Sequence, residues 1–342
     1  MTTTPRGWIR LALLALLACA LPVPAVAAAD PCPLLRAQHS APDAATRIAA
    51  AACEEHQAWH RPFIDAQGRL AGSVVREAEA ALLANGQPAW QRVGEYWRGS
   101  GLLRQVMQRP GAVECAQPPA QHSAAACRSF IVDTPWSAAF VSWVMRRAAL
   151  PGFGASASHV DYVRAAYRDP EGSAYRIADP RAAKPAPGDL LCYVRVADRS
   201  YGFGGLATLL GSEGGGLGMH CDVVVSASER GDRLARLVGG NVLDGVTMRL
   251  LPLSPGGHFQ DLPMRLEGDP ACTPDAPEAC NANRQDWAAL LQLRPQAELA
   301  RLAPPPPLQG PASSPVAPQC CVHCVVGAGV PRCPAGTPAP GR

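Results

Sequence analysis

A serine at the start of a predicted helix, Ser137, is the residue of this chain best placed for nucleophilic chemistry. The apolar spacing from Pro135 to Ala149 predicts a helix, and Thr134 and Pro135 are typical of helix starts. Unpaired backbone N–H groups and the positive helix dipole favour an anion there. A serine also needs a well-placed general base. Alternatively, Ser137 is only a small polar residue of a first turn.

Four short motifs follow one another along the chain in a defined order. They are Pro135-Trp136-Ser137-Ala138-Ala139-Phe140-Val141, Gly188-Asp189-Leu190-Leu191, His220-Cys221-Asp222-Val223-Val224-Val225 and Gly239-Gly240-Asn241. As an ordered set they resemble the papain-like cell-wall amidases of the NlpC/P60 and CHAP superfamily, in which a cysteine commonly occupies the place of Ser137. Residues 130–255 resemble in particular the serine-bearing DUF2272 family.

The resemblance implies a fold, a reaction and a set of catalytic residues. The fold would be α+β, a papain-like (NlpC/P60-type) domain whose nucleophile-type helix packs on a small antiparallel sheet, with extra N-terminal helices. Ser137 would be the nucleophile, His220 the general base and Asn241 the residue that orients the imidazole. The reaction would be hydrolysis of an amide bond in peptidoglycan or its peptide fragments, with no cofactor and no metal ion.

Three further residues are candidates for the site, two within these motifs and one between them. Asp222 is a second candidate to orient His220, because residues 220 and 222 of a strand share a face and a carboxylate favours a charged imidazole. Its alternative role is a strand cap or an ion pair with an arginine. His159, at the start of the next predicted helix, is expected to cap that helix or contact substrate. Trp136 is expected in the core, although beside Ser137 it could line the cleft.

Two other functions fit the same residues. A non-catalytic protein could bind cell-wall peptides or a protein partner through the same cleft, and the serine in place of cysteine favours this interpretation. A serine esterase or acyltransferase would suit an oxygen nucleophile. The presence of both His220 and Asn241 favours an enzyme, because binding alone has no chemical need for them.

The N-terminal residues predict export. Arg6 and Arg10 precede a short apolar run and an alanine-rich exit, which is the pattern of a signal peptide over residues 1–29. The run is shorter than the ~20 residues of a spanning helix, so we expect no transmembrane segment. We expect a periplasmic or secreted protein, with lipidation at Cys19 as an alternative. The formal net charge of +3 gives no basis for binding nucleic acid.

Cysteine is abundant, with 13 residues in the chain. In an exported protein this usage favours disulfides. Proximity suggests the pairs Cys32–Cys53, Cys115–Cys127 and Cys272–Cys280, whereas Cys192 and Cys221 could form a bridge or remain buried thiols. Disulfides are also preferred for the tail, with zinc as the alternative for its Cys320, Cys321, His323, Cys324 and Cys333.

Composition predicts five segments along the chain. They are a signal peptide (1–29), a helical N-terminal region (30–129), the papain-like NlpC/P60-type domain (130–300), a Pro-rich linker (301–319) and a Cys-rich tail (320–342). Helices are expected at 44–56, 74–83, 87–96, 135–149, 159–168 and 286–293. Strands are expected at 190–196, 220–226, 233–238 and 246–251. Loops are expected at 109–129 and in the glycine-rich residues 200–218.

Overall fold

A computed structural model describes residues 1–2, 30–72, 75–116, 121–212, 215–228, 231–305, 325–327 and 330–332. Residues 3–29 of the expected signal peptide, most of the expected Pro-rich linker and the Cys and His residues of the tail lie outside these ranges. The expectations about lipidation at Cys19 and about zinc in the tail therefore fall outside the described residues.

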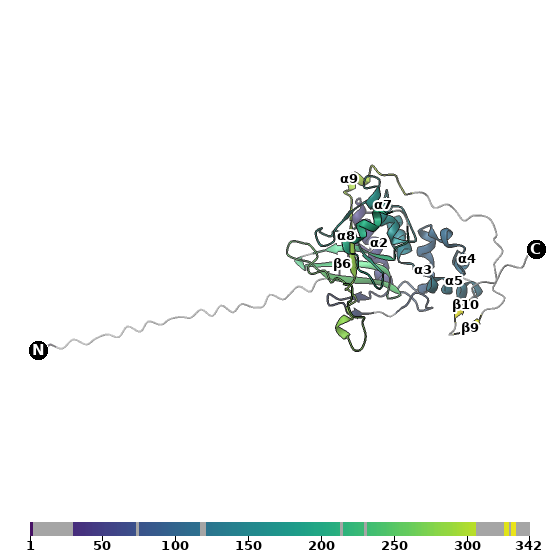
Figure 1. The fold of residues 1–342 in the computed structure, drawn as a ribbon, viewed down its shortest axis with the longest axis horizontal. Helices are drawn as coiled ribbons and strands as arrows, with labels where there is room; N and C mark the ends of the chain where they lie inside the picture. Colours follow the sequence, from purple (N-terminus) through teal and green to yellow (C-terminus); the bar gives the residue numbers. More distant parts are fainter. Residues whose placement is uncertain are drawn as a thin grey trace, which may run out of the picture.

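Eight strands of the described residues form one sheet at the centre of the fold (Figure 1). Their order across the sheet is β2 (Leu70–Ala71), β1 (Phe63–Ile64), β7 (Gly245–Pro252), β6 (Leu234–Val242), β5 (Met219–Ala227), β4 (Leu190–Val194), β8 (Asp286–Leu293) and β3 (Tyr175–Ala178). Neighbouring strands are antiparallel, except that β1 is parallel to β7. The fold is α+β as expected, but the sheet has four more strands than expected, namely β1, β2, β3 and β8. It is mixed because β1 is parallel to β7.

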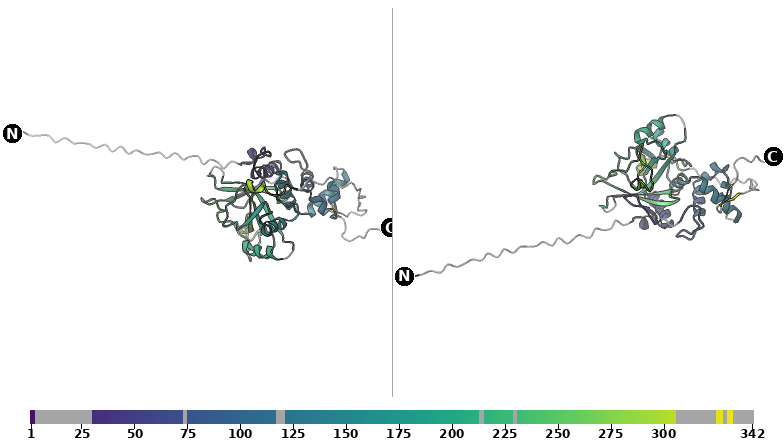
Figure 2. Two further views of the ribbon diagram at one scale, coloured as in Figure 1. Left: turned by 90° about the horizontal axis from the view of Figure 1, so that it is seen from above. Right: turned by 60° about the horizontal axis from the view of Figure 1, so that its bottom comes forward.

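The helices position the site by packing on this sheet. They are α1 (Cys32–Leu35), α2 (Ala44–Ala58), α3 (Ala89–Gly99), α4 (Ala112–Ala116), α5 (Gln121–Asp133), α6 (Ser137–Arg147), α7 (His159–Arg168), α8 (Gly202–Gly211) and α9 (Gln296–Leu299). Helices α2 and α6 contact β5 and β6, α7 contacts β3 and β5, and α8 contacts β8. Helices α3 to α5, blue in Figure 2, lie to one side of the sheet. Short 3-10 turns occupy Leu102–Val106 and Pro277–Ala279, and β9 (Val325–Gly327) pairs with β10 (Val330–Arg332).

The central strands are buried on both faces. Leu190 and Cys192 of β4 belong to the main apolar cluster, which also contains side chains of α2, α3, α6 and α7. Leu191 and Tyr193, which alternate with them, belong to a second cluster around Trp287. Burial on both faces makes β4 a continuous apolar run rather than an alternating one.

Burial on both faces also explains why the helix expected at residues 286–293 was wrong. Residues 286–293 were expected to be helical, but they form β8, where Ala288, Ala289 and Leu291 belong to the main cluster and Trp287 and Leu290 to the second. A short apolar run without alternation does not distinguish a doubly buried strand from a helix.

Three further local expectations were wrong. Residues 202–211 form α8 although they are rich in glycine. The backbone N–H groups of Tyr201 and Gly202 donate to the buried Asp286 carboxylate at 2.7 and 2.8 Å, and Leu206 and Leu210 are buried one turn apart. The expected loop at 109–129 contains α4 and the beginning of α5. Described residues 75–83 contain no helix where one was expected.

Helix α7 has the expected bounds, 159–168, and the expected strands correspond to β4, β5, β6 and β7. The three disulfides suggested by proximity are confirmed. Cys192 and Cys221 form a fourth, between directly opposite positions of β4 and β5. Four disulfides fit a protein that folds outside the cytoplasm. No helix within the described ranges has the length and apolar character needed to cross a bilayer.

Candidate functional site

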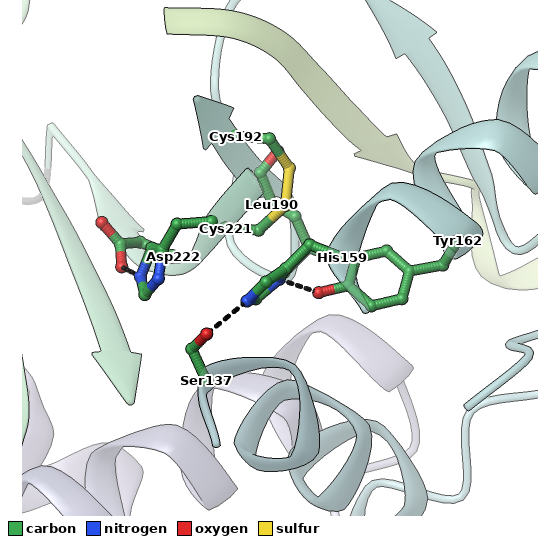
Figure 3. The surroundings of a disulfide bond; sticks show 8 residues. Ser137, His159, Tyr162, Leu190, Cys192, Cys221 and Asp222 are labelled. Carbon is green, nitrogen blue, oxygen red and sulfur yellow. Dashed lines mark hydrogen bonds and ion pairs between the residues drawn. A yellow bond between two sulfur atoms is a disulfide. The ribbon is translucent and has the colours of Figure 1, made fainter. Parts of the chain in front are cut away.

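Ser137 is the first residue of α6, and its side chain points toward His159 (Figure 3). The helix begins two residues after the expected start, with Trp136 as its N-cap, and the Phe140 N–H donates to the Trp136 carbonyl at 2.9 Å. Oγ of Ser137 lies 2.7 Å from Nε2 of His159. Both side chains are almost excluded from solvent, with exposed fractions of 5% and 3%.

His159 begins α7, and Tyr162 follows it by one helical turn on the same face. The Tyr162 hydroxyl contacts Nδ1 of His159 (Figure 3). Burial lowers the pKa of His159 well below its usual value, and the charge of His220 lowers it further. The imidazole is therefore neutral near pH 7. When its proton is on Nδ1, that N–H donates to Tyr162, and Nε2 is free to accept the Ser137 proton.

A second hydrogen-bonded chain runs through His220, Asp222 and Arg249. Nε2 of His220 lies 2.8 Å from Oδ1 of Asp222, and Nε of Arg249 donates to Oδ2 at 3.1 Å. Burial alone would raise the pKa of Asp222, but His220 and Arg249 lower it to about 2. When the His220 proton is on Nε2, that N–H donates to the ionised carboxylate, and Nδ1 then carries a lone pair. That atom is buried and has no hydrogen-bond partner among the described residues.

The two histidines lie side by side. Their ring centroids are 5.1 Å apart with an interplanar angle of 43°. The Tyr193 ring, from the position on β4 opposite His220, lies 5.1 Å from the His220 ring. The hydroxyl of Ser137 thus meets His159, which was expected to cap a helix or contact substrate. His220, the expected general base, lies beside His159 and pairs with Asp222.

Asn241 lies at a β-bulge of β6, where the register with β7 shifts, and its φ of 58° is in the left-handed region that asparagine tolerates. In the orientation that satisfies both neighbours, its amide nitrogen donates to Glu77 Oε2 at 3.1 Å and its oxygen accepts from the Trp136 N–H at 3.2 Å. The Asn241 side chain therefore hydrogen-bonds to Trp136, the residue before Ser137, and not to an imidazole.

The two glycines before Asn241 have separate steric roles. A Cβ on Gly240 would lie 2.4 Å from Cγ of Phe140 in α6, and a Cβ on Gly239 would lie 1.9 Å from Oδ1 of Asp222. Gly240 lets α6 approach the sheet closely, and Gly239 leaves room for the Asp222 carboxylate. Each position of Gly239-Gly240-Asn241 therefore serves the site geometry.

The disulfide between Cys192 and Cys221 lies next to the site (Figure 3). Cys221 separates His220 from Asp222 along β5, and the bond ties this part of β5 to β4. It also consumes both thiols, so neither is available as a nucleophile. Among the described residues no group of three or more His, Cys, Asp and Glu side chains is placed to hold a metal ion.

Three residues of this geometry had not been singled out from the sequence: Glu77, Tyr162 and Arg249. The spacing of His159 and Tyr162 on a predicted helix was a usable signal, because residues three apart on a helix are neighbours. Glu77 and Arg249 reach the site from distant parts of the chain, and only the tertiary fold brings them there.

Comparison with known proteins places the chain in a family. No curated protein and no solved structure matches it. The family described as "Uncharacterized protein conserved in bacteria (DUF2272)" matches residues 84–293, which is more than half of the chain. This range contains Ser137, His159, His220 and Asn241. The chain therefore belongs to the DUF2272 family.

Proposed function

We propose that this protein is an exported acyl-transfer enzyme that hydrolyses amide bonds in peptidoglycan peptides, with Ser137 as its nucleophile. The observation that carries the proposal is the 2.7 Å contact between Oγ of Ser137 and Nε2 of His159, at the first residues of α6 and α7. A hydroxyl against a neutral imidazole, which is itself oriented by a third group, is the arrangement that activates a serine.

In the first half of the reaction, His159 accepts the Ser137 proton on Nε2 while Oγ attacks the carbonyl carbon of the substrate. Negative charge develops on the carbonyl oxygen, and the N–H groups of the first turn of α6 favour an anion there. As the C–N bond breaks, the imidazolium returns its proton to the leaving amine. The acyl group is then held as an ester on Ser137.

In the second half, water hydrolyses this ester. A base takes one water proton while the water oxygen forms the new C–O bond, and the proton then returns to Oγ of Ser137. His159 is in contact with Oγ and can perform both transfers. The unpartnered Nδ1 of His220 is a further acceptor beside it and can hold a water or a substrate N–H.

Support for a cell-wall substrate comes from the chain as a whole. The N-terminal pattern predicts export to the periplasm or the medium, and four disulfides suit an oxidising compartment. The papain-like resemblance of the four ordered motifs points to wall peptides.

The experiment uses the purified exported protein with its disulfides intact. A fluorophosphonate probe, muropeptides and simple esters are offered to wild type, Ser137→Ala, Ser137→Cys and His159→Gln, with Ser40→Ala as an exposed-serine control. We expect labelling and cleavage by wild type and Ser40→Ala, none by Ser137→Ala, and a loss of about 10²-fold or more in His159→Gln. Cleavage that survives Ser137→Ala would reject the proposal.

A second function, binding of wall peptides without catalysis, is favoured by the serine at position 137, where the resembled amidases have a cysteine. Exposed fractions of 5% for Ser137 and 3% for His159 mean that a substrate must displace covering groups to reach them. If wild type is inert, an active Ser137→Cys protein indicates a hydrolase that has lost its nucleophile. Retention of muropeptides by three inert proteins, wild type, Ser137→Ala and Ser137→Cys, indicates a binding protein.

A further inference from the structure

Trp136, the residue that precedes Ser137, is held by two side chains from distant parts of the chain. Its indole Nε1–H donates to Oε2 of Glu77 at 2.5 Å. The Asn241 amide nitrogen donates to the same oxygen at 3.1 Å, and the amide oxygen accepts from the Trp136 backbone N–H at 3.2 Å. Glu77 therefore hydrogen-bonds to the side chain of Trp136, and Asn241 to its backbone. We refer to Glu77, Asn241 and Trp136 as the Trp136 clamp.

We propose that Glu77 and Asn241 are positioning residues for Ser137, because the Trp136 clamp fixes the first turn of α6 and thereby the contact of Oγ with His159. This inference rests on the proposed role of Ser137 as the reactive residue. It assigns Asn241 a role in placing the nucleophile, and it adds Glu77, which lies outside the residues matched by the family.

The clamp contacts the backbone of Trp136, whereas packing in the core holds only its side chain. The indole is fully buried and already stacks with Trp59 and Tyr96, at centroid distances of 5.9 and 5.5 Å. Stacking holds the ring, but it makes no directional contact with the backbone. The hydrogen bond from the Trp136 N–H to Asn241 does so at the residue adjoining Ser137. A shift of about 1 Å in a reacting group can lower a rate by about 10²-fold.

The bulge of β6 supplies the geometry. Asn241 lies where the β6–β7 register shifts, which turns its side chain out of the regular alternation. The hairpin continues through Leu243 and Asp244, both with positive φ, and the Asp244 carbonyl accepts the Glu77 N–H at 2.7 Å. The β6–β7 hairpin therefore places Asn241, which is part of it, and Glu77, which is held to it by a backbone hydrogen bond.

The charge of Glu77 makes the clamp sensitive to pH. Burial raises the pKa of Glu77 to about 7; the hydrogen bond from Trp136 partly opposes this, and the Asp244 charge adds to it. On a neighbouring element, Arg128 of α5 donates from Nε to the adjoining Ala78 carbonyl at 2.6 Å. Ionised Glu77 accepts both hydrogen bonds strongly. Protonation weakens them, so the clamp loosens as the pH falls through about 7.

The test compares the full exported protein with Glu77→Gln, Glu77→Ala and Asn241→Ala, and uses Glu79→Gln as a control two residues away on the surface. The readout is the rate of fluorophosphonate labelling of Ser137 from about pH 6 to about pH 8. We expect the wild-type rate to fall severalfold as the pH drops through about 7, in a step separate from the titration of His159, whose pKa lies well below its usual value. Glu77→Gln keeps both hydrogen bonds without the charge, so the step disappears. Glu77→Ala and Asn241→Ala lower the rate about 10-fold or more at every pH.

Two further measurements separate this inference from the proposed function. The indole N–H signal of Trp136 in ¹⁵N–¹H NMR is expected to titrate near pH 7 in wild type and not in Glu77→Gln. In a Ser137→Cys background, the alkylation rate of the thiol reports its placement without requiring Ser137 to react. If alkylation depends on Glu77 while wild-type Ser137 is inert, the inference holds and the hydrolase proposal fails. Clamp variants that fold and label or alkylate like Glu79→Gln overturn the inference.

Discussion

Oγ of Ser137 lies 2.7 Å from Nε2 of His159, and the two residues begin consecutive helices, α6 and α7. The starts of both helices therefore meet at one point near the sheet. Helix starts favour negative charge, so the point where they converge favours an anion. His220 approaches the same point from β5, with its ring 5.1 Å from that of His159.

Replacing His220 with asparagine should raise the pKa of His159. Burial is the main cause of the low His159 pKa, and the charge of His220 adds to it, whereas Asp222 acts in the opposite direction. Removing His220 takes away one of the effects that lower this pKa, while burial and Arg195 still lower it and Asp222 still raises it, so the imidazole takes up its proton at higher pH than in wild type. The histidine Cε1–H signal followed against pH by NMR measures this. His258→Asn is the control, and an unchanged or lower pKa in His220→Asn would contradict the assigned contact.

Arg249→Met should destabilise the protein by about 3–5 kcal/mol near neutral pH, because it leaves a buried carboxylate without its cation. Asp222→Asn combined with Arg249→Met should cost less than the sum of the two single changes. The pKa of Asp222 is lowered to about 2 in the folded protein, so its contribution to stability is lost as the pH falls from about 4 toward 2. The difference between wild type and Arg249→Met should shrink over that range.

Urea unfolding at several pH values checks this prediction. Arg69→Met is the matched control, since Arg69 pairs with Asp65 on the surface, where its side chain is 74% exposed. An exposed pair contributes only about 0–1 kcal/mol. Equal effects of the two arginine changes would mean that the Asp222–Arg249 pair is not buried as described.

Gly240→Ala should lower the free energy of unfolding by about 1–3 kcal/mol, since the added methyl group meets Phe140 across the α6–sheet contact. Gly154→Ala places a methyl group in open space and should leave stability nearly unchanged. The same unfolding measurement compares them. Because α6 carries Ser137, labelling of Ser137 should slow in Gly240→Ala and stay at the wild-type rate in Gly154→Ala.

Removing the Cys192–Cys221 disulfide by paired alanine substitutions should cost more stability than removing Cys272–Cys280. The first closes a separation of 29 residues and the second one of 8. In the chain-entropy account this difference corresponds to about 1 kcal/mol, on top of the ~2–4 kcal/mol typical of a disulfide. Thermal unfolding of the two variants compares them directly. The opposite order would show that the shorter loop stabilises through native contacts instead.

Local sequence patterns predicted the parts of this fold that depend on neighbouring residues. Helix α7 and strands β5 to β7 follow from their own periodicity, and three disulfides follow from short separations. The placement of Ser137 at a helix start has the same local origin. In each case the residues that decide the structure lie within one or two turns, or one hairpin, of each other.

Long-range packing decided the rest. The sequence of β8 does not alternate between apolar and polar residues because both faces of the strand are buried. Helix α8 forms where Asp286 of β8 accepts hydrogen bonds from the backbone at its start. Sequence order placed His220 among the candidates for Ser137, but which histidine meets the hydroxyl depends on how α6, α7 and β5 pack together. Asn241 contacts Trp136 instead of an imidazole because a bulge redirects its side chain. Residue types in this chain thus indicate which groups can react, whereas their pairing is set by packing between elements far apart in sequence.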